Sequence, residues 1–116
     1  MSQPVILKIY GNLSPCDAAL AARVAELASA AIPPVASIEF SGGLLTIAFE
    51  GIYYPVEETL AMIAAAIGPD QRGRLDVFDL EAWQLDRYHI EAGQISATSA
   101  PLNTVLANSV RPEAGA

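Results

Sequence analysis

The sequence predicts a single α+β domain, and three observations support this fold class. Short segments that alternate apolar and polar residues, a pattern typical of strands, occur near both ends and in the middle of the chain. Two longer segments repeat apolar residues every three or four positions and predict helices. Glycine and proline pairs separate these segments and indicate turns. The 116 residues are enough to enclose one hydrophobic core.

The N-terminal third predicts a strand followed by a helix. Residues 5–10 are apolar and β-branched, and Gly11 is expected to end this strand. Ser14 is expected to cap the helix, because the proline after it suits the first helical position and Asp17 then has the capping-box spacing. The helix is predicted to run to about Ile32, where two prolines stop it.

The middle of the chain predicts a hairpin and a second helix. Residues 38–40 and 45–49 alternate apolar and polar side chains, and the Gly-Gly pair between them suits a two-residue turn, because glycine tolerates positive φ. A helix is predicted from Pro55 to Ile67, with acidic residues in its first turn, where the helix dipole favours them. A glycine and a proline then end it.

The rest of the chain predicts mostly extended structure. Alternation with a period of two returns at 75–78 and again at 83–90, and residues 79–82 between them are interpreted as a β-bulge or a short turn. An Ala-Gly pair at 92–93 is expected to form a hairpin turn that leads into a strand at 94–98.

The order of these elements matches the split βαβ, or ferredoxin-like, arrangement, βαββαβ. A C-terminal hairpin strand and a short helix at 101–108 would extend it. Such a sheet is antiparallel and carries helices on one face, which leaves the other face to solvent or to a partner. The predicted domain covers residues 1–108, and residues 109–116 are expected to form a disordered tail.

Composition excludes several kinds of partner. The formal net charge is −7 and the chain has a single lysine, whereas nucleic acids and anionic membranes are bound by clustered lysines and arginines. The longest apolar runs are too short to cross a bilayer. A hydrophobic fraction of 53% with only 16% charged residues favours an apolar patch that a partner covers. We therefore expect a homo-oligomer or a complex with another protein.

Cys16 is the only cysteine, so no internal disulfide is possible. The chain start lacks the pattern of a signal peptide, and the cytoplasm is the expected compartment. The position of Cys16 after the first strand is similar to that of the reactive cysteine in glutaredoxin-like proteins, but the segment has no second cysteine and Asp17 disfavours a thiolate. A packing role is the preferred interpretation.

Residues 70–91 contain the only tryptophan, the only histidine, three of the six basic residues and six of the thirteen acidic ones. Strand alternation places Trp83, Leu85, Arg87 and His89 on one face, with Arg87 in reach of a cation–π contact to the indole. These residues and Tyr88 are our candidates for an interface or ligand surface, because Trp, Tyr and Arg are enriched in interface hot spots. The alternative is that the apolar members cover the inner sheet and the polar ones form its rim.

Tyr53 and Tyr54 precede the second helix and complete the candidate residues. They could flank a pocket for a small cationic or polyhydroxylated ligand. The alternative is that they pack against the beginning of the helix as a hydrophobic staple.

Catalysis and metal binding have weaker support. His89 could act as a general base with a carboxylate from residues 76–81, but the sequence shows no nucleophile beside it, although Ser96 or Thr98 could lie across the hairpin. Asp76 and Asp79 would point to opposite faces of a strand, and they match no calcium-loop spacing. The acids of this region are Asp70, Asp76, Asp79, Glu81 and Asp86, and we expect them to be solvated or paired with arginines. No metal site and no cofactor are predicted.

The leading functional hypothesis is a small non-enzymatic interaction or assembly module that self-associates through a sheet face or edge. A small-molecule binding or sensing domain is the second hypothesis, and an enzyme that uses His89 is a minor third.

Overall fold

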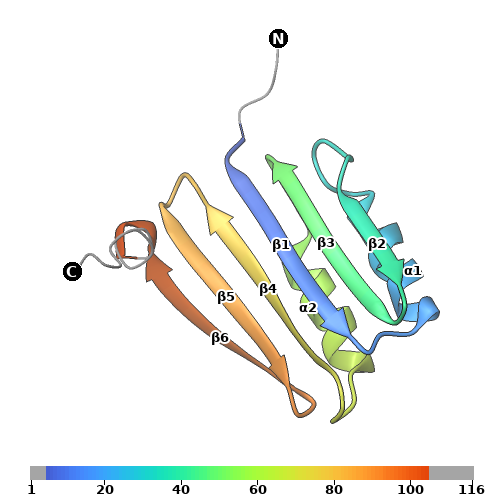
Figure 1. The fold of residues 1–116 in the computed structure, drawn as a ribbon. Coiled ribbons are helices and arrows are strands. Elements are labelled where there is room, and N and C mark those ends of the chain that lie inside the picture. Colours follow the sequence, from blue (N-terminus) through green and yellow to red (C-terminus); the bar gives the residue numbers. More distant parts are fainter. Residues whose placement is uncertain (1–4, 105–116) are drawn as a thin grey trace.

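A six-stranded antiparallel sheet forms one layer of the structure, and two helices pack against one of its faces (Figure 1). The computed structural model describes residues 5–104. The strands follow the order β2-β3-β1-β4-β5-β6 across the sheet. Along the chain the elements are β1 (Leu7–Ser14), α1 (Ala18–Ala28), β2 (Ser37–Ser41), β3 (Leu44–Gly51), α2 (Val56–Ala66), β4 (Arg72–Asp79), β5 (Gln84–Glu91) and β6 (Gln94–Pro101).

The predicted class, an α+β domain with helices on one face of an antiparallel sheet, is confirmed. The segment 79–82, interpreted as a bulge or a short turn, overlaps a turn at residues 80–83 that makes β4 and β5 antiparallel neighbours. Of the short helix expected at 101–108, residues 102–104 are described and are helical. The tail expected at 109–116 lies outside the described residues.

The predicted junction between β1 and α1 was wrong. The strand continues past Gly11 to Ser14, which pairs with Arg72 of β4 and is therefore not the helix cap. Asp17 caps α1 instead, and its Oδ1 accepts the Leu20 N–H at 2.7 Å. Gly11 is needed within the strand because a Cβ there would lie only 2.6 Å from a side-chain methyl of Leu75. Helix α1 also ends early, at Ala28.

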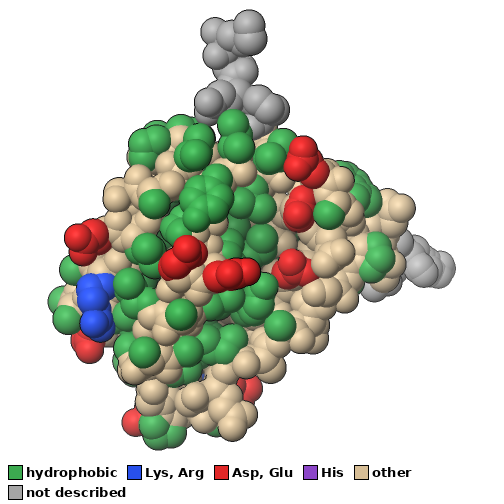
Figure 2. All heavy atoms as spheres, turned by 180° about the vertical axis from the view of Figure 1, so that it is seen from behind, with side chains coloured by type: hydrophobic (Ala, Val, Ile, Leu, Met, Phe, Trp, Pro, Cys, Tyr) green, Lys and Arg blue, Asp and Glu red, His purple; other side chains and the backbone are tan. Residues whose placement is uncertain are grey.

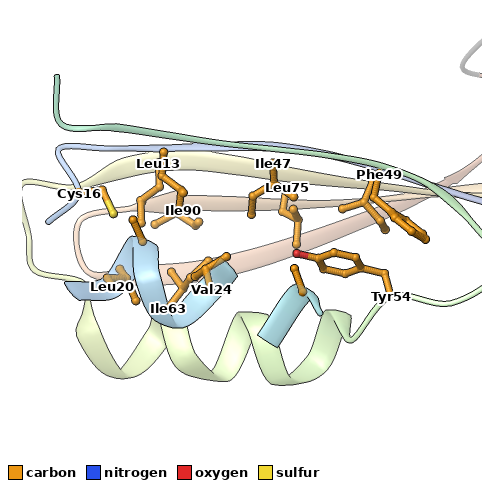
Figure 3. Packing of buried hydrophobic residues seen from close by; sticks show 14 of the residues in the cluster. Leu13, Cys16, Leu20, Val24, Ile47, Phe49, Tyr54, Ile63, Leu75 and Ile90 are labelled. Carbon is orange, nitrogen blue, oxygen red and sulfur yellow. The ribbon is translucent and has the colours of Figure 1, made fainter. Parts of the chain in front are cut away.

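The main core lies between the helices and the central strands (Figure 3). Alternate residues of β1, β3 and β4 point towards α1 and α2, and a fully buried leucine or isoleucine contributes roughly 1.5–3 kcal/mol. The most completely buried side chains are Ile9, Leu13, Leu20, Val24, Leu45, Thr59, Ile63 and Leu75.

The helices cover only part of the sheet. Figure 1 shows α1 and α2 behind β2, β3, β1 and β4, whereas β5 and β6 extend beyond them. Both predicted hairpin turns are present, with positive φ at Gly42 and Gly43 and again at Ala92 and Gly93. The β5–β6 hairpin widens the sheet by two strands beyond those that lie in front of the helices.

Close packing between β1 and β4 gives a first prediction. A Cβ on Gly73 would meet the backbone of Asn12 and lie 3.0 Å from Leu13 Cα, so Gly73→Ala should destabilise the fold by about 1–3 kcal/mol. Gly68→Ala is the matched control, because no atom lies within 4 Å of its added methyl group. Urea unfolding of both variants measures the difference. Equal stability of the two variants would contradict the observed closeness of these strands.

Candidate interaction surface

The face of the sheet opposite α1 and α2, which we call the uncovered face, carries side chains from all six strands. Strand register aligns them in rows, of which one contains Ser37, Ala48, Tyr10, Asp76, Arg87 and Thr98. The next row contains Glu50, Lys8, Phe78, Leu85 and Ala100. The face is therefore mixed in character, with aromatic and aliphatic residues towards the β4–β5 turn.

A small apolar cluster at this corner is separate from the main core. Leu85 and Leu102 are 6% and 3% exposed, yet neither belongs to the cluster beneath the helices. The Leu102 N–H donates to the carbonyl oxygen of Trp83 at 2.9 Å, and the indole Nε1–H donates to Asn103 Oδ1 at 2.8 Å. The residues after β6 are thus tied to the β4–β5 turn.

A pocket of about 290 Å³ opens beside this cluster. We call it the corner pocket, and its lining residues are Lys8, Tyr10, Phe78, Leu80, Trp83 and Leu102. The rings of Tyr10 and Phe78 meet edge to face, with their centroids 6.2 Å apart. Tyr10 and Trp83 are 39% and 43% exposed, so both aromatic rings remain available to a partner.

Glu50 organises the polar side of the corner pocket. The Tyr10 hydroxyl donates to Glu50 Oε2 at 2.6 Å, and this hydrogen bond raises the pKa of Tyr10. Lys8 Nζ lies 3.9 Å from the same carboxylate oxygen. The tyrosine therefore keeps its proton at neutral pH, and its ring is held in one orientation.

Asp76 is nearly buried and is paired with arginine. Arg87 donates to it through Nε at 2.8 Å and Nη2 at 3.1 Å, and this contact raises the pKa of Arg87. Arg74 Nε lies 3.5 Å from the other side of the carboxylate. A bidentate arginine pair satisfies both oxygens of the acid, so the arrangement is structural.

The uncovered face differs in charge from the rest of the molecule. Strand alternation places on it four of the six basic residues of the chain, which are Lys8, Arg72, Arg74 and Arg87. The same alternation places four acidic residues there, Glu39, Glu50, Asp76 and Glu91. Basic and acidic residues on the uncovered face are thus equal in number, although the whole chain carries a net charge of −7. On the helix-covered side, Figure 2 shows acidic side chains around an apolar centre.

Four of the sequence candidates belong to this face. Leu85, Arg87 and His89 lie on it, in agreement with strand alternation. Trp83 was expected on the strand but lies in the β4–β5 turn with a φ of 57°, and its ring still lines the corner pocket. Leu85 is only 6% exposed and is therefore not presented to a partner.

The tyrosine candidates lie elsewhere. Tyr88 faces the helices, where it packs half-buried against the main core, so it cannot share a surface with Arg87. Tyr54 is 2% exposed and its ring packs 5.4 Å from Phe49, pointing into the core in Figure 3. Tyr53 is exposed and lines a separate hollow of about 270 Å³ with Tyr54, Val56, Glu57 and Glu58.

The residues considered for chemistry are dispersed. Within residues 5–104 no group of three His, Cys, Asp or Glu side chains could hold a metal ion. Asp79 accepts the N–H groups of Glu81 and Ala82 in the turn, and Asp86 accepts from Ser99 at 2.6 Å. His89 is exposed, between Arg74 and Ser96 in the register.

Cys16 is 6% exposed at the beginning of α1, and its Sγ donates to the Asp17 carbonyl oxygen at 3.4 Å. Burial raises the pKa of the Cys16 thiol, and the charge of Asp17 raises it further. The thiol is therefore protonated at neutral pH, which agrees with a packing role.

Comparison with protein-family models, with curated protein sequences and with solved structures finds no match. In the part of the chain that the structure describes, no helix is long and apolar enough to cross a membrane.

The sequence did not reveal the corner pocket itself. Lys8 and Tyr10 lie in β1 and Phe78 lies in β4, about 70 positions later, so only the β1–β4 register brings the three residues together. Their alternation with the buried residues Ile9 and Val77 is the signal that could have assigned them to the uncovered face.

The Asp76 pair gives the second prediction. Arg87→Met leaves a nearly buried carboxylate without its bidentate partner and should destabilise the fold by about 1–3 kcal/mol. Arg74→Met is the matched control, since this side chain is 50% exposed and its pairing should be worth about 0–1 kcal/mol. Urea unfolding at neutral pH measures the stability of both variants. An equal loss of stability in the two variants would overturn the structural role of Arg87.

The Cys16 thiol gives the third prediction. Its alkylation by iodoacetamide should accelerate only at a pH above that at which an exposed cysteine ionises, because burial and Asp17 both disfavour the thiolate. Asp17→Asn should lower the pKa of Cys16 while the asparagine still caps α1. The measurement is the rate of alkylation as a function of pH for the wild type and for the Asp17→Asn variant. A wild-type thiol that ionises at or below the pH of a free cysteine would refute this interpretation.

Proposed function

We propose that this chain is a non-enzymatic interaction and assembly module of ferredoxin-like type, which binds a partner protein on its uncovered sheet face. The strand order β2-β3-β1-β4 supports the ferredoxin-like description, because α1 connects β1 to β2 and α2 connects β3 to β4 on the same face. The β5–β6 hairpin then widens the sheet. A cytoplasmic location, which the single cysteine favours, is part of the same proposal.

The observation that carries the proposal is the pair of exposed aromatic rings at the corner pocket. Tyr10 and Trp83 are each about two-fifths exposed on a face that the helices leave open. Tryptophan and tyrosine dominate interface hot spots, because they bury a large area at a small cost in side-chain entropy. An aromatic pair around a hollow is therefore suited to receive an apolar side chain from another protein.

The size of the pocket favours a protein side chain over a free metabolite. Its volume of about 290 Å³ lies at the lower limit of sites that enclose a small ligand, which span roughly 300–1,000 Å³. A single aromatic or aliphatic side chain needs less space, and the flat strands around the pocket can support the remainder of a docked segment.

The charge around the pocket indicates what flanks that apolar side chain. Lys8 lines the pocket, and Arg87 and Arg74 follow in the next rows of the same face. Lys8 is accompanied by Glu50 at 3.9 Å. Arg74 and Arg87 share the single carboxylate of Asp76, so among these residues one positive charge beside the pocket remains without an acidic partner. We therefore expect a partner segment with an apolar anchor and neighbouring carboxylates, whose charges this side of the molecule attracts.

The small-molecule hypothesis rests on the hollow beside Tyr53, where Glu57 and Glu58 would favour a cationic ligand. It has less support, because the Tyr54 ring that lines this hollow is turned into the core. A ligand of the folded state would raise the melting temperature in a thermal-shift screen of cationic metabolites.

Selection of peptides from a random phage-displayed library tests the docking proposal and is the fourth prediction. We expect enriched peptides to share one aromatic or aliphatic residue beside acidic residues. Calorimetry should then show at least about tenfold weaker binding to Trp83→Ala, the loss expected for a hot spot. Lys8→Glu should also weaken binding, and unfolding curves establish that both variants fold.

Tyr53→Ala is the matched control, because Tyr53 is 42% exposed but lies outside the corner pocket. Its affinity for the selected peptides should equal that of the wild type. No enrichment of peptides, or an equal loss in the Trp83 and Tyr53 variants, would overturn the proposal.

A further inference from the structure

We infer that two copies of this chain pair edge to edge through β6 and form one continuous sheet about a two-fold axis at Ala97. This inference rests on the assembly part of the proposed function, and it names the partner as a second copy. It stands on the outer edge of β6 and is independent of the corner pocket.

Among residues 5–104, no segment pairs with the outer edge of strand β6. The strand contains eight residues, Gln94–Pro101, all uncharged, and six of them are exposed. Folded proteins usually protect such an edge with charged side chains, bulges or very short strands, because its free N–H and C=O groups can pair with another chain. Neither a charge nor a bulge interrupts the pairing of β6 with β5.

The opposite edge of the sheet is protected. Strand β2 has only five residues, and Glu39 lies at its centre. A pair of prolines precedes the strand by three residues, and neither has an N–H to donate. The contrast identifies β6 as the edge suited to pairing.

The hairpin determines which backbone groups of β6 face outwards. Ala92 and Gly93 both have positive φ, as in a two-residue turn, so Glu91 and Gln94 form the hydrogen-bonded pair that closes it. Hydrogen-bonded and non-bonded pairs then alternate along the ladder. Alternate residues of β6 therefore bond to β5, and the intervening residues Ile95, Ala97 and Ser99 direct their N–H and C=O groups to the outer edge.

The ends of the strand determine the register of the pairing. Pro101 would be the next residue to face outwards, but it lacks an N–H, and the turn at Gly93 limits the other end. Ala97 lies midway between these limits. An antiparallel second copy then pairs Ala97 with its own equivalent and Ile95 with Ser99, and each of these directly opposed pairs exchanges two backbone hydrogen bonds.

Side chains across the axis are compatible with this register. Ser96 of one copy lies opposite Thr98 of the other on the uncovered face, and such hydroxyl pairs stabilise sheets. Ala97 meets Ala97 on the opposite face, where a methyl group leaves room. Because identical strands related by a two-fold axis are self-complementary, the assembly closes as a dimer.

Helices α1 and α2 do not block the approach, because they lie behind the far strands and β6 extends past them (Figure 1). A two-fold axis perpendicular to the sheet keeps both uncovered faces on the same side. The dimer would therefore present two corner pockets in one direction, and a partner with two matching segments would bind both and gain avidity.

Charge reversal at the axis provides the fifth prediction. Ala97→Lys places two ammonium groups opposite one another, and Ala97→Glu places two carboxylates there, so each variant should sediment as a monomer where the wild type sediments as a dimer. An equimolar mixture of the two variants should sediment as a dimer again, because lysine then faces glutamate. Ala25→Lys, on the exposed side of α1, is the control and should remain dimeric.

A monomeric wild type in the range from micromolar to millimolar, a dimeric Ala97→Lys variant, or a mixture that stays monomeric would each overturn the inference. Binding of the selected peptides separates this failure from failure of the docking proposal. The Ala97→Lys monomer should bind them as the wild type does, whereas Trp83→Ala should remain a dimer. Unfolding curves establish that the variants keep the fold.

Discussion

The backbone pairing of β1 with β3 on one side and β4 on the other determines the rest of the structure. Its register decides that Ile9 and Leu13 point to the helices while Lys8 and Tyr10 point away from them. A slip of one residue would exchange the two faces, burying the polar set and exposing the core. The close backbone contact at Gly11 and Gly73 secures this register, because side chains at these positions would collide with the neighbouring strand. The corner pocket, which Lys8 and Tyr10 of β1 and Phe78 of β4 line, therefore depends directly on this register.

The sheet is wider than the helices that cover it, and this mismatch produces the surfaces. Two helices of eleven residues each lie behind four strands, so only the near side of the β5–β6 hairpin, at Tyr88, Ile90 and Ile95, packs against the core. The chain compensates at one corner, where Leu102 and Leu85 are both buried and Leu102 is hydrogen-bonded to the β4–β5 turn. No segment within the described residues pairs with the outer edge of β6. Aromatic rings at the corner and unpaired backbone at the edge are the two kinds of group that a protein partner satisfies.

Local patterns in the sequence predicted the fold class and the hairpins, and they placed Leu85, Arg87 and His89 on one face. Predictions were wrong where a distant contact overrides the local signal. Gly11 resembles a turn residue, but Leu75, 64 positions later, requires a glycine inside the strand. Asp17 replaces Ser14 as the helix cap because β4 extends the pairing of β1. The corner pocket combines residues from both ends of the described chain, and no local pattern could have predicted it.

Amide hydrogen exchange along β6 tests the central claim most directly, because it reports the bonding of each N–H separately. In a monomer the amides of Ser96, Thr98 and Ala100 are bonded to β5, whereas those of Ile95, Ala97 and Ser99 are open to solvent. Our account predicts slow exchange for both sets at high protein concentration, with protection of the second set lost on dilution. Rapid exchange of Ile95, Ala97 and Ser99 at every concentration would contradict it.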